Sequence, residues 1–205
     1  MRRDVPRVII ALAALLAAAV YSESYARLMS PAYLVVARFL ADNQPWDITA
    51  VEVEPGKADI HGELHLRADI RRHLGDSKPV ARVVGHLQVG SVVETPLIFW
   101  AILLLWPSGS GERTLLAILA GIPVAIALEA LTTVAQLVAP LAGASALIAG
   151  QAHGATLEKW SALLEEGGRV VICVLAALLV IALARRLAEP PEPGAADRAP
   201  PAAHR

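Results

Sequence analysis

Two long apolar runs, separated by a short polar turn, are the dominant pattern of this sequence. The first is VGSVVETPLIFWAILLLWP, beginning at Val89, and the second is TLLAILAGIPVAIALEALTTVAQLVA, ending at Ala139. The turn between them is SGSGER. About 20 apolar residues cross the roughly 30 Å hydrocarbon core of a bilayer as a helix. The pattern therefore predicts a transmembrane hairpin with helices over 91–107 and 114–139.

Two further apolar segments lie near the ends of the chain. The N-terminus begins with the basic stretch MRRDVPR and continues into an alanine-rich run over 8–20. Such a start is typical either of a cleaved signal peptide or of an uncleaved anchor over 1–24, and the anchor is our prediction. The last run, over 169–186, begins at Arg169 and ends in two arginines. Together the four runs predict about four transmembrane helices.

The hydrophobic period changes to two before the hairpin. Leu64 and Leu66 alternate with polar neighbours, and the same alternation is found on either side of this stretch. Strict alternation is typical of strands with one buried face. We therefore expect an antiparallel sheet of three strands, over about 49–54, 60–67 and 80–89, with a hairpin turn at Pro55-Gly56-Lys57.

A three-stranded sheet buries little surface alone, so its apolar face needs a cover. An amphipathic helix over 31–43 is one candidate, and the bilayer surface and a partner protein are two others. Ser30-Pro31 is typical of a helix start, with serine as the N-cap and proline in the first turn. The segment 25–90 is thus expected to be a small α+β domain.

The second half of the chain predicts shorter elements. Residues 140–150 are small and apolar and are expected to form a loop at the headgroups. Leucine and tryptophan recur at helical spacing over 156–166, which predicts an interfacial helix that ends at Gly167-Gly168. The Pro/Ala-rich tail over 188–205 is expected to be disordered.

Charge sets the expected orientation. Basic residues flank membrane helices on the cytoplasmic side. With both termini cytoplasmic, the 25–90 domain is extracytoplasmic, and the arginines next to the helices fall inside. The prediction is a multi-pass protein of a bacterial inner membrane. The arginines in question are Arg2, Arg3, Arg7, Arg113, Arg185 and Arg186.

Composition agrees with the membrane class. The 205 residues are 56% hydrophobic, above the roughly 45–50% of an ordinary soluble domain. A net charge of −1 gives no bulk attraction to nucleic acid, so no nucleic-acid partner is expected. Cys173 is the single cysteine of the sequence and excludes an intramolecular disulfide. It lies in an apolar run, where cysteine usually behaves as a small buried hydrophobe.

Three ionisable residues fall at a similar predicted depth. Counting along the helices at about 1.5 Å per residue places Glu94 and Glu129 in the same outer layer, and Arg169 enters from that side. Charges at membrane depth usually face the bundle interior in pairs. Two interpretations of this layer are open. It is a functional site, either a polar pocket or a surface where a partner binds. Otherwise its role is structural, with Glu94 at the membrane interface and Glu129 paired with Arg169.

Evidence for catalysis in the sequence is slight. His61, Glu63 and His65 share one strand face with His86 nearby, which fits either a zinc site or an ordinary wet sheet face. No nucleophile elbow, phosphate loop, dinucleotide fingerprint or zinc-protease motif is present in the sequence. We therefore expect a protein that is not an enzyme, without catalytic residues, cofactor or metal.

The layout itself carries a resemblance. Most of residues 5–187 follow one plan. An N-terminal anchor comes first, and a short external αβ segment follows it. The chain then enters the membrane hairpin at GSVVETPL, over 90–97, and continues into two further helices with a basic inner end. This plan resembles the small membrane proteins associated with exosortase H, a bacterial envelope protein-sorting system. The resemblance implies a membrane partner, the exosortase, and supplies no site residues.

The expected function is that of a non-enzymatic accessory protein of an envelope sorting or export complex, with the lipid bilayer and an exosortase-like membrane protein as its partners. Two alternatives remain open from the sequence. A membrane-embedded transporter subunit would need Glu94 or Glu129 to line a water-filled path. An outer-leaflet enzyme would depend on the face that carries His61, Glu63 and His65.

Overall fold

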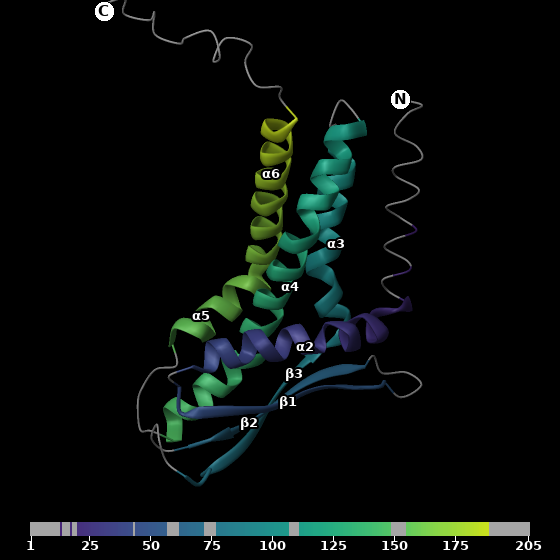
Figure 1. The fold of residues 1–205 in the computed structure, drawn as a ribbon. Coiled ribbons are helices and arrows are strands. Elements are labelled where there is room, and N and C mark those ends of the chain that lie inside the picture. Colours follow the sequence, from purple (N-terminus) through teal and green to yellow (C-terminus); the bar gives the residue numbers. More distant parts are fainter. Residues whose placement is uncertain are drawn as a thin grey trace, which may run out of the picture.

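The fold is mostly helical, with one small antiparallel sheet (Figure 1). The computed structural model describes residues 13, 17, 20–42, 44–56, 62–71, 77–106, 111–148 and 155–188. The expectations for most of the anchor over 1–24, for His61, for the turn over 107–110 and for the tail from 189 lie outside these residues. The elements in chain order are α2 (Ser22–Ala41), β1 (Trp46–Glu54), β2 (Glu63–Ile70), β3 (Ala81–Gln88), α3 (Val89–Leu105), α4 (Gly111–Ile148), α5 (Ala155–Leu163), the π-helical turn η1 (Leu164–Gly168) and α6 (Arg169–Leu187).

The three strands follow the predicted alternation, but β2 covers Glu63–Ile70 and not the predicted 60–67. The sheet has the order β1-β2-β3, and β2 buries Leu64, Leu66 and two further side chains on a single face. The register shifts between Ile48 and Ala50, which leaves Thr49 as a bulge. Ile48 rather than Thr49 therefore faces the core, a detail that alternation alone could not predict.

Helix α2 begins earlier than Ser30-Pro31, so the predicted helix start there is wrong. It runs from Ser22 through Pro31 without a break. A proline inside a helix leaves the carbonyl four residues earlier without its donor. That carbonyl belongs to Arg27, and the Ser30 hydroxyl donates a hydrogen bond to it at 2.8 Å. Ser30 thus compensates for the proline instead of capping a new helix.

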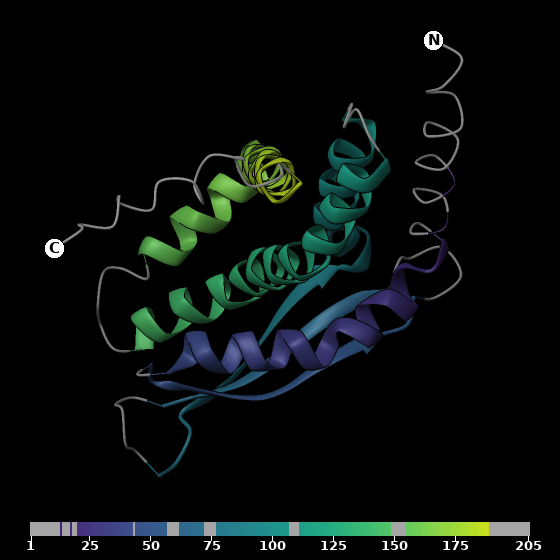
Figure 2. The same cartoon turned by 45° about the horizontal axis from the view of Figure 1, so that its top comes forward.

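The apolar face of the sheet is covered by the chain itself. Helix α2 lies across this face, alongside the second half of α4 (Figures 1 and 2). The resulting core joins Tyr33 of α2 and Leu66 of β2 to Val134 and Leu137 of α4. Of the three predicted covers, the helix is therefore confirmed, and α4 is a second cover that the sequence did not indicate.

Helix α4 belongs to two different cores. Its 38 residues extend for about 57 Å, nearly twice the roughly 30 Å of a bilayer core. Up to Leu128 only one stripe, which includes Ala117 and Ala125, is buried against neighbouring helices. From Thr132 to Ala139 every residue is buried, and Val134, Leu137 and Val138 belong to the core of the sheet domain. The predicted loop over 140–150 is wrong, because α4 continues through Pro140 to Ile148.

The first half of α4 packs with α3 and α6 as a three-helix bundle. Its core contains Phe99, Ala125, Cys173 and Ala177. Among the described residues, two helical stretches are long and apolar enough to cross a membrane, Gly111–Ile148 and Leu157–Leu187, and not the predicted four. Helix α3 is apolar but has only 17 residues.

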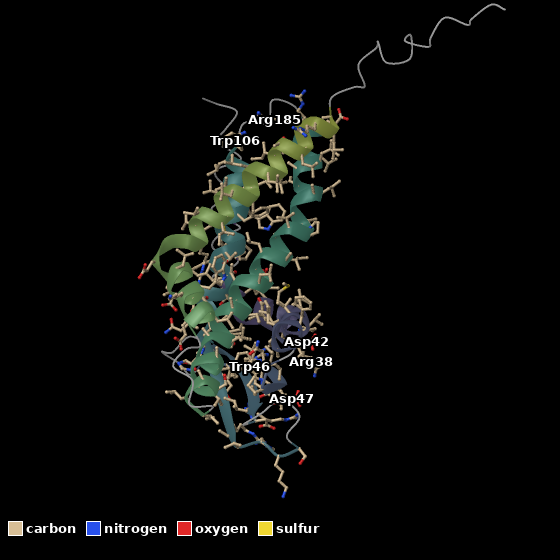
Figure 3. The ribbon with its side chains drawn as sticks, turned by 90° about the vertical axis from the view of Figure 1, so that its left-hand side faces the viewer. Arg38, Asp42, Trp46, Asp47, Trp106 and Arg185 are labelled. Atoms are coloured by element: carbon tan, nitrogen blue, oxygen red, sulfur yellow. The ribbon has the colours of Figure 1, made fainter. Side chains whose placement is uncertain are left out.

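A sharp bend separates α5 from α6. Gly167, inside η1, adopts at φ 105° the left-handed conformation that favours glycine. The structure thus has a helix over most of the predicted 156–166 and a new helix from Arg169, close to the predicted bounds. The two ends of the molecule differ in chemistry. Figure 3 shows Trp106 and Arg185 at the far end of the bundle, and Arg38, Asp42, Trp46 and Asp47 at the sheet end.

Gly85 provides a test of the contact between the sheet and α4. A Cβ atom at this position would lie 2.1 Å from the Leu137 carbonyl oxygen, which is backbone and cannot rotate away. We expect Gly85→Ala to lower the free energy of unfolding by about 2–3 kcal/mol, measured by denaturation in detergent. Gly90→Ala is the control, since a Cβ there meets nothing within 4 Å. A Gly85→Ala variant as stable as this control would contradict the close approach of β3 to α4.

Candidate functional site

Arg169 is the centre of a polar cluster where the bundle meets the sheet domain. The residue is 7% exposed and stands at the first position of α6. Its Nη1 donates to Glu94 Oε2 at 2.5 Å and to the Ser91 carbonyl oxygen at 2.8 Å. Its Nη2 donates to Gln136 Oε1 at 2.7 Å. One guanidinium therefore connects α3, α4 and α6 at a single level.

An open groove of about 360 Å³ adjoins this cluster. The Glu94 side chain is 58% exposed and lines the groove, whereas Arg169 and Gln136 are almost fully buried. The walls combine charged, amide and aliphatic groups, so the groove is amphipathic. Its lining residues are Leu87, Ser91, Glu94, Ile98, Gln136, Leu164, Glu165, Gly167, Arg169 and Val170.

Small polar contacts fix the helices next to the groove. The buried hydroxyls of Thr95 and Thr132 lie 3.2 Å apart, between α3 and α4. The Cys173 thiol donates to the Thr95 carbonyl oxygen at 3.5 Å, between α6 and α3. Cys173 is buried, as its apolar surroundings in the sequence predict. These contacts fix the distances between α3, α4 and α6, and the Arg169 side chain spans the space between these helices.

Glu129 forms a second and separate polar cluster. Its side chain is fully buried, and the hydroxyls of Tyr25 and Tyr33 donate to its two carboxylate oxygens. Burial, and then the nearby Glu129, raises the pKa of both tyrosines well above the usual value. The tyrosines therefore keep their protons and act as donors. This contact fastens α2 to α4 at the point where α4 enters the sheet domain.

The structure divides the predicted polar layer into two clusters. Arg169 lies against Glu94, and Glu129 is held by tyrosines rather than by Arg169. Tyr25 and Gln136 are not predicted from the sequence as partners of these charges. Two features of the sequence could have indicated them. Tyr25 and Tyr33 lie eight residues apart on one helix, and Gln136 is a single amide within an apolar run.

The exposed face of the sheet carries alternating charges. His65 lies between Glu54, at 3.3 Å, and Glu63, at 2.9 Å, and faces His86 on β3. The hydrogen bond with His65 holds the pKa of Glu63 below its usual value. Within the described part of the chain, which omits His61, no group of three His, Cys, Asp or Glu residues is placed to hold a metal ion.

The tyrosine contacts of Glu129 can be tested by removing one hydroxyl. Tyr33→Phe leaves a buried carboxylate oxygen without its donor. We expect a loss of about 1–3 kcal/mol in the free energy of unfolding, measured in detergent. Tyr21→Phe removes the same group from a side chain that is 64% exposed, and we expect a change within about 0.5 kcal/mol. Equal stability of the two variants would show that the Tyr33–Glu129 contact does not stabilise the fold.

The comparisons with known proteins add no assignment to this geometry. A scan against protein-family models, a search of curated proteins and a search of solved structures each find no match to the chain. The resemblance to exosortase H-associated proteins therefore stays a prediction, and the function is argued from the residues themselves.

Proposed function

We propose that this chain is a multi-pass integral membrane protein that acts as a non-catalytic accessory subunit of an envelope sorting or export complex. The observation that carries the membrane part of the proposal is the outer surface of the bundle. Leu175 and Leu179, one turn apart on α6, are 61% and 69% exposed, and α4 exposes Leu115, Leu119 and Ile122. Large exposed aliphatic side chains of this kind fit lipid or a neighbouring membrane helix better than water.

The dimensions of the bundle support the same proposal. The 17 residues of α3 extend for about 25 Å, the lower limit for a helix that crosses a bilayer. Arg169 and Arg186 are separated by about 26 Å along α6. An anchor over 1–24 would add a fourth span to α3, the first half of α4 and α6.

The charge distribution favours a cytoplasmic position for the far end of the bundle. Arg113 and Arg185 line one pocket there beside Trp106, and Arg186 follows at the end of α6. Arginines near helix ends favour the cytoplasm, and tryptophan favours the interface. The sheet domain is then extracytoplasmic, and both termini are cytoplasmic.

The accessory role is supported by where a partner could bind. Helices of this chain already cover the apolar face of the sheet, so that face offers no docking surface. The exposed aliphatic faces of α4 and α6 remain, together with the polar cluster at their junction. A partner that also spans the membrane can contact both. The layout-level resemblance suggests an exosortase-like protein as this partner.

Orientation can be measured with single-cysteine variants. Because Cys173 is the only cysteine, Cys173→Ser gives a background without thiols. We expect a cysteine at Thr49 to react with a membrane-impermeant maleimide in intact spheroplasts, and a cysteine at Arg186 to react only after lysis. Sodium carbonate should leave the protein in the membrane. Release by carbonate would contradict membrane integration, and the reverse labelling pattern would contradict the orientation.

The accessory role predicts a stoichiometric partner. We expect gentle purification of the tagged chain from native membranes to recover a membrane transpeptidase or an export component, identified by mass spectrometry. An unrelated polytopic protein with the same tag is the control. Recovery of the chain alone, as a stable homo-oligomer, would overturn the accessory role and favour the transporter alternative. Carbodiimide labelling of Glu94 with loss of flux would then test that alternative.

A further inference from the structure

We propose that the groove beside Arg169 binds the headgroup of an aminophospholipid. In this proposal Glu94 and Glu165 accept hydrogen bonds from the primary ammonium group, and Arg169 donates to the phosphodiester. The inference rests on the proposed membrane integration, but it does not depend on a partner protein. It assigns a ligand class to a site that the fold leaves open.

The position of the groove fits a headgroup. Ser91 and Glu94 lie in the first two turns of α3, and Arg169 is the first residue of α6. The bundle extends from this level for about 18 to 24 Å, counted along α3 and α6, to Trp106 and Arg185 at the other end. The groove therefore lies in the outer part of the predicted hydrocarbon layer, near its boundary on the side of the sheet domain.

The lining of the groove matches an amphipathic ligand. Leu87, Ile98, Leu164 and Val170 provide aliphatic contacts, and Val170 continues into the exposed apolar surface of α6. A volume of about 360 Å³ falls within the range of small-molecule sites, about 300–1,000 Å³. A lipid can place its headgroup among the polar residues and extend its acyl chains along the bundle.

The charges in the groove favour a cation. Two carboxylates, Glu94 and Glu165, and one guanidinium, Arg169, line it, so the local formal charge is −1. Arg169 is paired with Glu94, and Glu165 is exposed in the first turn of η1. A primary ammonium group carries three N–H donors and can bind both carboxylates at once.

Arg169 also retains donors for an anion. A guanidinium has five N–H groups. The contacts to Glu94, Ser91 and Gln136 use three of them. Its Nε has no hydrogen-bond partner among the described residues, although the side chain is more than nine-tenths buried. The Nε atom is itself fully buried, so the second hydrogen of Nη2 is the donor that Arg169 has left for a phosphodiester oxygen in the groove.

The chemistry predicts an order of lipid affinity. Phosphatidylethanolamine carries both a primary ammonium and a phosphodiester. Phosphatidylcholine has a quaternary ammonium without N–H donors, and phosphatidylglycerol has no cation. All three share the phosphodiester and can carry the same acyl chains. A preference for the ethanolamine lipid therefore reports on hydrogen bonds to the carboxylates, rather than on apolar contacts.

The test uses the purified full chain in detergent, titrated with these three lipids and analysed by native mass spectrometry. We expect about fivefold more bound phosphatidylethanolamine than either other lipid at equal concentration. Glu165→Gln should lower ethanolamine binding towards the level of the choline lipid. Glu166→Gln, at the adjacent exposed residue that does not line the groove, should leave it unchanged. Glu94→Gln extends the series but also removes the ion pair with Arg169.

Three results would overturn the proposal. These are equal binding of the three lipids, equal effects of Glu165→Gln and Glu166→Gln, and displacement of the lipid by soluble glycerophosphoethanolamine at equal concentration. The last result would identify a water-soluble phosphoethanolamine compound as the ligand in place of a lipid. If carbonate extraction leaves the chain in the membrane and the chain binds all three lipids equally, that result contradicts only this inference. Release by carbonate contradicts the membrane proposal itself.

Discussion

Helix α4 is the element on which the two halves of the molecule depend, because one continuous rod takes part in both hydrophobic cores. Up to Leu128 it exposes leucine and isoleucine and buries a single stripe of small residues against α3 and α6. Beyond Glu129 one face of it packs against α2 and the sheet. The sheet domain is thus built onto a helix of the bundle, and Gly85 permits the backbone of β3 to approach that of α4.

The polar groups lie where α4 changes surroundings, and this placement has a physical reason. A charge deep in hydrocarbon is costly, and a charge in a sealed core must be paired with good geometry. Where the bundle meets the sheet domain, a charge can lie outside the deep hydrocarbon and can also be paired. Glu129 faces inward, where tyrosine hydroxyls from α2 satisfy it. Glu94 faces outward to the groove and shares Arg169 with Gln136. Two separate clusters result, although a count along the helices places the three charges in one layer.

Local patterns in the sequence predict the strands and the α5–α6 bend, because alternation and paired glycines act on near neighbours. They fail where tertiary packing overrides a local rule. Pro31 is tolerated inside α2 because Ser30 satisfies the carbonyl of Arg27 and the helix is held against the sheet. Pro140 is tolerated in α4 because burial on both sides of it compensates for one lost backbone bond. The partners of Glu129 lie about 100 residues away along the chain, and no local pattern encodes such a pairing.

The groove follows from how the bundle is assembled. The Arg169 side chain reaches between α3 and α4, so its guanidinium occupies a place where aliphatic side chains would otherwise interdigitate. The bend at Gly167 then carries α5 away from the bundle axis, and Glu165 and Leu164 line the groove. A space bounded by a guanidinium, two carboxylates and aliphatic walls is poorly filled by water alone and poorly filled by acyl chains alone. A ligand with a charged head and apolar tails satisfies both parts of the surface, which is why a lipid is a better complement to this groove than a purely polar solute.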